Sequence, residues 1–297
     1  MKKPRKNKRK WSKKFFEILI GVWNCWSLSN ERYGYCRDDL QYDILGLTEL
    51  HNEQAKQQYQ GRRWVCSAAA PIDEQGNCSD PAAGVAILLS ERIADKVLDE
   101  GHVGTRIAWV RLAGPVCNIF YVVTYIPHQG RTSKPLAADT IGQLKELLQT
   151  VRKSDCIILA GDFNCQLQRN VQGCTGQWCM TQKPDGAHGE QILELMREHD
   201  LFAADTLFKP QRKLWQGKMR YCNATYMSKE EGKRPRKLDY ICVSNRWKSM
   251  VLNSTVKWGP SFHRFGQKFD HGCLNAKWRW RTNTTVKKET GGLRGHD

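Results

Sequence analysis

The sequence predicts a layered α/β or α+β domain, and three observations carry this prediction. Short apolar runs rich in Ile, Val and Leu recur from residue 15 onward, each with the length and composition of a β-strand. Two segments between them show the apolar spacing of a helix. With 297 residues, 40% of them hydrophobic, and 11 Trp, the chain can bury a sizeable core.

The elements follow one another without a Pro/Gly-rich linker. Helices are expected at 136–151 and 191–199, and the mixture of strands and helices favours packed layers. One domain is expected over residues 15–281, with a flexible basic arm at 1–14 and a polar tail at 282–297. The expected strands are EILIGVWNCWSL, YDILGLTEL, GVAILLS, RIAWVRLAG, VCNIFYVVTYIPH, CIILAGDFN, KLDYICVS and HGCLNAKWRWR.

Composition excludes several classes of protein. The 12 cysteines form no CxxC pair and no zinc-like spacing, so reduced and mostly buried thiols are expected. No apolar stretch reaches the roughly 20 residues needed to span a bilayer. A soluble nuclear or otherwise intracellular protein without a membrane partner is therefore expected.

The formal net charge of +17 is concentrated in two places. Residues 1–14 carry nine Lys or Arg and no acid, and residues 209–248 carry twelve against three acids. Such concentration suits a polyanionic partner, with Arg234, Arg236 and Lys237 as candidate phosphate contacts. A solvated, solubilising surface is the alternative for both runs, and the arm also fits a nuclear localisation signal.

One predicted strand runs directly into Gly161-Asp162-Phe163-Asn164. Asp and Asn form strands poorly, and such a stretch is often only a turn in which these side chains bond to the backbone. The functional alternative is that residues two apart on an extended segment point to one side. Asp162 and Asn164 would then face a common reacting centre.

Other predicted strands also end on polar residues. Each of these has a structural explanation of its own, such as a cap, a surface ion pair or a buried histidine with its partners. Taken together they favour a site, because a buried carboxylate is costly unless it is paired or binds a metal. These residues are Asn24, Glu49, Tyr125, His128, Asp239, Asp270 and His271.

The ordered set of these residues resembles the endonuclease/exonuclease/phosphatase family. Its members include pancreatic deoxyribonuclease and abasic-site endonucleases, and the likeness is closest to the endonuclease domains of non-LTR (LINE-type) retrotransposons and their craniofacial-development-protein-like relatives. It covers roughly residues 18–281, and the segments GEQILELMREHDLFAADTLF and LDYICVSNRW add to it. The set consists of Asn24, Glu49, Tyr125-x-Pro-His128, Gly161-Asp162-Phe163-Asn164, Leu238-Asp239-Tyr240 and Asp270-His271.

The resemblance implies a four-layered α/β sandwich, with two mixed sheets face to face and helices outside. It also implies an Mg²⁺-dependent DNA endonuclease, with Mn²⁺ as the other possible ion. Glu49 would be the main metal ligand, assisted by Asn24 and Asp270. Asp162 would deprotonate the attacking water and Asn164 would hold its geometry.

The resemblance assigns the remaining polar residues to the phosphate. His271 would bond to it while Asp239 orients the ring, and Tyr125 would donate to a phosphate oxygen or assist the leaving group. His128 stands where many relatives have Asn.

Two further positions depart from the family pattern. Abasic-site members have Asp where this chain has Trp26, and a small residue commonly stands where it has Phe269. A phosphoesterase acting on RNA or on phosphorylated small molecules therefore stays open as an alternative, as does a nucleic-acid-binding module without activity. Trp278 and Trp280 share one face of the last strand, where a core role is favoured over base stacking.

Overall fold

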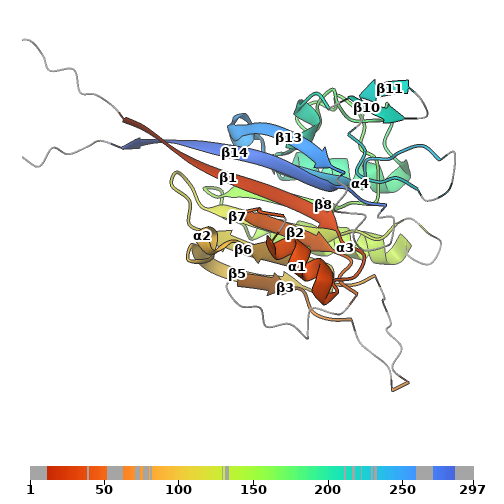
Figure 1. Ribbon diagram of the computed structural model, residues 1–297, viewed down its shortest axis with the longest axis horizontal. Helices are drawn as coiled ribbons and strands as arrows, with labels where there is room; N and C mark the ends of the chain where they lie inside the picture. The colour runs from red at the N-terminus through yellow and green to blue at the C-terminus, as the bar shows by residue number, and fades with distance from the viewer. Residues whose placement is uncertain are drawn as a thin grey trace, which may run out of the picture.

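The computed structural model describes two six-stranded mixed sheets that pack face to face (Figure 1). It describes residues 12–38, 40–51, 63–70, 74–75, 80, 82–128, 130, 134–210, 212–215, 218–221, 223–228, 230, 233–258 and 270–284. The first sheet has the order β13 (Val251–Lys257), β14 (Cys273–Thr284), β1 (Ser12–Asn24), β2 (Ile44–Thr48), β4 (Val85–Leu89) and β3 (Arg63–Cys66). The second has the order β5 (Val97–Val103), β6 (Ile107–Leu112), β7 (Ile119–Tyr125), β8 (Cys156–Asp162), β12 (Asp239–Ser244) and β9 (Leu201–Ala203).

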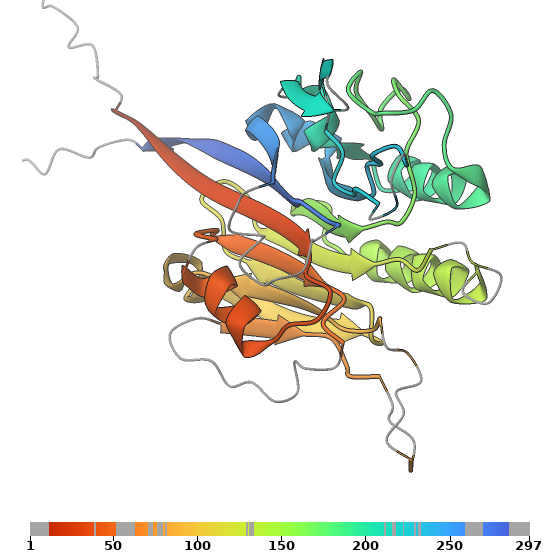
Figure 2. The same cartoon turned by 45° about the vertical axis from the view of Figure 1, so that its right-hand side comes forward.

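Helices cover the outer face of each sheet, which gives the expected four layers (Figure 2). Helix α1 (Asn30–Asp38) packs on the first sheet, and α3 (Lys134–Gln149) and α4 (Gly186–Glu198) lie side by side on the second. The short helix α2 (Glu91–Ala94) precedes β5, and 3-10 turns occupy Ala204–Leu207 and Asn245–Met250. A hairpin of β10 (Arg212–Trp215) and β11 (Lys218–Tyr221) stands apart from both sheets. The predicted fold class is confirmed.

Alternation along the strands of the second sheet separates the core between the two sheets from the core beneath the helices. In β7, Tyr121 and Val123 face the opposite sheet, while Phe120 and Val122 face the helices. The same period of two applies to β8, where Ile158 and Ala160 lie between the sheets. Burial on both faces explains why these strands are continuous apolar runs in the sequence.

The observed elements differ from the predicted ones mainly at edges and ends. The eight predicted strands and both predicted helices are present, whereas α1, α2, β3, β5, β9, β10, β11 and β13 are additional. Most of the additional strands are short or lie at a sheet edge, where one side is solvated and the apolar signal is weak. Strands β1 and β14 pair from Ser12 and Thr284 inward, so regular structure extends three residues beyond each predicted domain limit.

Three other expectations can be compared with the described residues. Trp278 and Trp280 are 0% and 1% exposed and stack on each other between the sheets, so the core interpretation holds and base stacking by them is excluded. No disulfide joins the cysteines in the described part of the chain, and most of these cysteines are buried. In the described part of the chain, no helix is long and apolar enough to cross a membrane.

Candidate functional site

The polar strand ends converge between the two sheets, at one end of the sandwich. Across the second sheet, Asp162 on β8 is directly opposite Asp239 on β12 and beside Tyr125 on β7. Each of these side chains has the same parity as the core residues of its strand, so each points toward the first sheet. The alternation that turns the core residues toward the first sheet therefore also turns these three polar side chains toward it.

The first sheet contributes from the facing side. Strands β1 and β2 are parallel, with Asn24 paired to Thr48, so Glu49 leaves the sheet beside Asn24. The Nδ2 of Asn24 donates to Oδ2 of Asp162 at 3.0 Å, which joins the two sheets through their polar ends. Glu49 has a left-handed backbone with φ of 56°, a sparsely populated conformation for a residue with a side chain.

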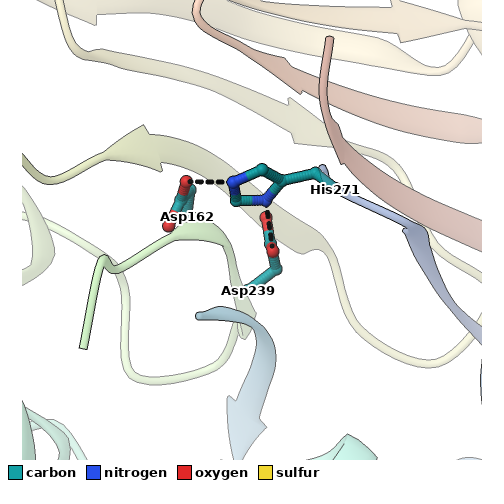
Figure 3. Close-up of side chains that lie close together, drawn as sticks. All are labelled: Asp162, Asp239 and His271. Carbon is teal, nitrogen blue, oxygen red and sulfur yellow. Dashed lines mark hydrogen bonds and ion pairs between the residues drawn. The ribbon is translucent and has the colours of Figure 1, made fainter. Parts of the chain in front are cut away.

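His271 completes the cluster from the turn before β14 (Figure 3). Its Nδ1 is 3.0 Å from Oδ2 of Asp239, and its Nε2 is 3.8 Å from Oδ2 of Asp162. All three side chains are buried. The separation of 3.8 Å exceeds a direct hydrogen bond, so Nε2 and the Asp162 carboxylate can both contact a third group placed between them.

Burial and neighbouring charges together raise the pKa values of both Asp162 and His271. Desolvation, followed by the negative charge of Asp239, raises the pKa of Asp162 to about 7. Desolvation lowers the pKa of His271, but the charges of Asp239 and Asp162 outweigh it and raise this pKa to about 10. At neutral pH the imidazole is therefore a cation, and Asp162 is poised between its two protonation states.

Glu49 and Tyr125 face each other across the same site. Desolvation raises the pKa of Glu49, but hydrogen bonds from His51, Asn24 and Tyr125 outweigh it, so the net shift is downward and the carboxylate is ionised. Desolvation, followed by the charges of Glu49 and Asp162, raises the pKa of Tyr125 far above its usual value. Its hydroxyl therefore keeps its proton and remains a hydrogen-bond donor.

The segment Gly161-Asp162-Phe163-Asn164 at the end of β8 both forms a turn and contributes a side chain to the site. Oδ1 of Asp162 accepts from the backbone N–H of Asn164 at 2.9 Å, as in an Asx turn, while Oδ2 faces the cluster. The chain is not extended at Asn164, where φ is 50°, so strand alternation does not apply to this residue and the orientation predicted from it was wrong. Its Nδ2 instead donates to the carbonyl of Ile126 at 3.0 Å and fixes the loop beneath Asp162.

Gly161 has a packing reason to be glycine. A Cβ at this position would lie 1.9 Å from the carbonyl oxygen of Thr124 on the neighbouring strand β7, and the residue has φ of 155°. Only glycine lets the two backbones approach this closely. The close approach brings Asp162 beside Tyr125 at the end of the sheet.

The donor chemistry at the Glu49 side fits a hard divalent cation. The Glu49 carboxylate is ionised, its side chain is 17% exposed, and it adjoins the Asn24 amide. Carboxylate and amide oxygens are ligands that Mg²⁺ accepts. Among the described residues, Asp162, Asp239 and His271 also form a group with ligand atoms within 4.8 Å of one another. A protonated imidazole has no lone pair to offer, so this second group fits proton and phosphate handling better than metal ligation.

The structure does not bring every predicted site residue into the cluster. Asp270 is half-buried beside His271, whose pKa its charge helps to raise, and its backbone carbonyl accepts from Met227. His128 is exposed three residues after Tyr125. Phe269 lies outside the described residues.

Lys237 was wrongly predicted as a nucleic-acid contact. It is 1% exposed, and its Nζ lies 2.6 Å from Oδ2 of Asp205 and 3.1 Å from the carbonyl oxygen of Asp239. A charge this deeply buried needs such partners and is not available to a phosphate from solution. Arg234 is exposed, and Arg236 is half-buried beside Asp185, so these two remain candidates.

Three residues that the sequence did not single out support the cluster. Oγ1 of Thr225 accepts from the backbone N–H groups of Leu238 and Asp239, both at 2.9 Å, and Tyr226 places its ring 5.1 Å from the ring of His271. Oδ1 of Asp205 accepts from the N–H of Ile241 at 2.9 Å. Asp205 lies just after β9, a strand of three residues that the sequence did not predict, so a search of predicted strand ends does not find it. Thr225 and Tyr226 follow no recognisable pattern.

A comparison with family models decides the classification. Residues 21–251 match the model described as "Endonuclease/Exonuclease/phosphatase family". The chain belongs to this family. No curated protein matches it by sequence. The predicted family is thus confirmed, and with it the general chemistry of a phosphoesterase or nuclease.

Solved structures of other proteins have a fold similar to that of this chain. A 3′ phosphatase from Neisseria bound to a product DNA hairpin has a TM-score of 0.63 at 17% identity, covering 89% of this chain and 100% of that one. An AP endonuclease from Leishmania major has a TM-score of 0.62 at 15% identity, covering 89% and 88%. The endonuclease domain of TRAS1, a telomere-specific non-LTR retrotransposon, has a TM-score of 0.52 at 12% identity, covering 89% and 98%. At these identities the likeness establishes the fold.

Proposed function

We propose that this family member is a divalent-metal-dependent DNA endonuclease of the retrotransposon type, which hydrolyses a phosphodiester by in-line attack of water. The observation that supports this most is the convergence of a base, a cation, a neutral donor and an ionised carboxylate at one end of the sandwich. These groups are Asp162, His271, Tyr125 and Glu49. In-line hydrolysis requires that combination within reach of one phosphate.

Asp162 takes the proton of the attacking water. The amide of Asn24 and the backbone N–H of Asn164 each hold one of its carboxylate oxygens, which leaves lone pairs directed at the space toward His271. As the water oxygen bonds to phosphorus, its proton passes to the carboxylate and the opposite P–O bond breaks.

His271 and Tyr125 stabilise the phosphate and the departing oxygen. Asp239 accepts the Nδ1 proton of His271, which leaves the Nε2 proton to be donated to a phosphate oxygen. Tyr125 keeps its hydroxyl proton, and its O–H, which bonds to Glu49 in the free protein, would turn to donate a hydrogen bond to a phosphate or leaving oxygen.

Glu49, assisted by Asn24, would hold the ion, Mg²⁺ or alternatively Mn²⁺. When bound, such an ion supplies positive charge that neutralises phosphate oxygens. The ionised state of Glu49 and its partial exposure support this role, because a ligand must be deprotonated and reachable.

DNA is the proposed substrate. The positive charge of the chain and the exposed Arg234 support a polyanion, and one structural relative was solved with a DNA hairpin. That relative is a 3′ phosphatase, which supports a second candidate, the removal of phosphate from a DNA 3′ end. The two candidates use the same chemical groups and differ in where the substrate strand ends.

Plasmid nicking tests the proposal. Supercoiled plasmid is incubated with the wild type, Asp162→Ala and Asp95→Ala in Mg²⁺, Mn²⁺ or EDTA. Asp95 is a matched control because its side chain is 69% exposed. Nicking is expected only with metal, unchanged in Asp95→Ala and reduced by about 10² or more in Asp162→Ala. Equal nicking by all three proteins would refute the assignment, and release of phosphate from a 3′-phosphorylated oligonucleotide without nicking would favour the second candidate.

A further inference from the structure

Trp26 stands at the end of β1, where the sequence departs from the abasic-site members of the family. It is one of the exposed large hydrophobic residues in the described part of the chain, with 39% of its surface accessible. Its backbone N–H donates to Oδ1 of Asn24 at 3.2 Å, and the amide of Asn24 donates to Asp162. Two hydrogen bonds therefore connect this tryptophan to the proposed general base.

The backbone of Trp26 adopts a conformation that a bulky residue rarely takes. Its φ is 42°, and that of Ser27 is 82°, so two successive residues with side chains are left-handed. This conformation costs free energy unless the surrounding structure enforces it. A smaller residue such as Gly or Asn would adopt this conformation with less strain than tryptophan does.

The loop is held in this conformation from two sides. One guanidinium nitrogen of Arg32, a residue only 8% exposed, binds the carbonyl oxygens of Cys25, Trp26 and Ser27. The N–H of Ser27 donates to the carbonyl of Glu49 at 2.6 Å, which ties the loop to the candidate metal ligand. Trp26 therefore lies on a loop whose backbone is held in place by hydrogen bonds.

We infer that Trp26 is a nucleobase-binding residue that stacks on a base flanking the scissile phosphate. This inference deepens the proposed function and rests on it. Trp26 is exposed on a loop whose backbone is hydrogen-bonded to Asn24 and to Glu49, and proteins bind single-stranded nucleic acid by combining charged groups with exposed aromatic side chains.

Equilibrium binding of two oligomers tests this inference. One is single-stranded DNA, and the other is a base-free deoxyribose-phosphate oligomer of the same length and charge, both measured by fluorescence anisotropy in EDTA so that neither is cleaved. Trp26→Ala is expected to bind the DNA about tenfold more weakly than the wild type. Its affinity for the base-free oligomer is expected to be unchanged, and Trp26→Phe is expected to retain most of the DNA affinity.

Trp26→Gly separates the contact from the loop. Glycine adopts a φ of 42° without strain, so this variant is expected to melt no lower than the wild type while losing the same DNA affinity as Trp26→Ala. An equal loss on both oligomers, or no loss on either, would overturn the inference. If the wild type nicks plasmid but Trp26→Ala binds DNA normally, only this inference fails. If the wild type neither nicks nor binds, the proposed function fails with it.

Discussion

Replacing Asp162 by asparagine is expected to stabilise the protein, and to do so more strongly at high pH. Asp162 is fully buried, and desolvation together with the charge of Asp239 raises its pKa to about 7 from an ordinary value of 3.8. A buried acid with a raised pKa binds its proton more tightly in the folded state than in the unfolded state. Its contribution to stability is therefore lost as the pH rises from the unfolded pKa to the folded one.

The magnitude follows from the two pKa values. The raised pKa of Asp162 lowers the stability of the fold by ~4 kcal/mol at pH 8, where the carboxyl must ionise in the interior, and by ~1.7 kcal/mol at pH 5, where it must hold a proton that the unfolded chain releases. Asparagine removes this cost at both pH values. It also loses about 1 kcal/mol, because its NH₂ group cannot accept one of the two hydrogen bonds that the carboxylate receives from Asn24 and Asn164. That loss does not depend on pH, so the gain should be larger at pH 8 by roughly 2.5 kcal/mol.

Thermal unfolding in EDTA measures this difference. For a chain of this size, roughly 2.5 kcal/mol corresponds to about 5 °C in Tm. Asp162→Asn should therefore gain about 5 °C more over the wild type at pH 8 than at pH 5, while the exposed control Asp95→Asn should show no such pH dependence. A variant that melts below the wild type at pH 8, or whose gain is the same at both pH values, would refute the reasoning. It would mean that the charge of Asp162 is well solvated in the fold.

Three further outcomes are expected. The rate of phosphodiester hydrolysis should rise as Asp162 ionises through a pKa of about 7 and fall as the His271 imidazolium loses its proton through about 10, which a pH profile of kcat would show; a rate that neither falls below about pH 7 nor falls above about pH 10 would count against both roles. Lys237→Met should lower the free energy of unfolding by ~3–5 kcal/mol in urea titrations, because it leaves its carboxylate partner buried and unpaired; a change near zero would contradict this. Gly161→Ala should cost roughly 3 kcal/mol or more, because its Cβ would overlap a carbonyl oxygen of β7. Gly142→Ala in α3, where the added Cβ meets nothing within 4 Å, should be neutral or stabilising.

Much of the fold could be predicted because buried strands have a local signature. The runs that became β7 and β8 are apolar on both faces, and the helix expected at 136–151 was found as α3 at Lys134–Gln149. Edge strands such as β5 were missed because their exposed positions carry polar residues, as in VLDEGHV. Helix α1 was missed because its charged sequence lacks an apolar stripe.

The candidate site was predicted to a similar extent. A carboxylate at the end of an apolar strand is visible in the sequence, which is why Asp162 and Asp239 could be named. Lys237 was assigned to the surface because lysine usually lies there. Nothing in the neighbouring sequence indicates that it pairs with Asp205 in the interior. Thr225 supports Asp239 only through backbone geometry, which a single sequence does not display.

The sequence by itself determined which residues are polar at strand ends and, through the alternation of side chains, which face of each strand they occupy. It also determined that so many buried carboxylates would need partners. Only the tertiary structure decided which partners they have, because strand order and register are set by packing between segments far apart in the chain. The pairing of β8 with β12 puts Asp162 opposite Asp239, and the packing of the two sheets brings Asn24 and His271 to the same carboxylate.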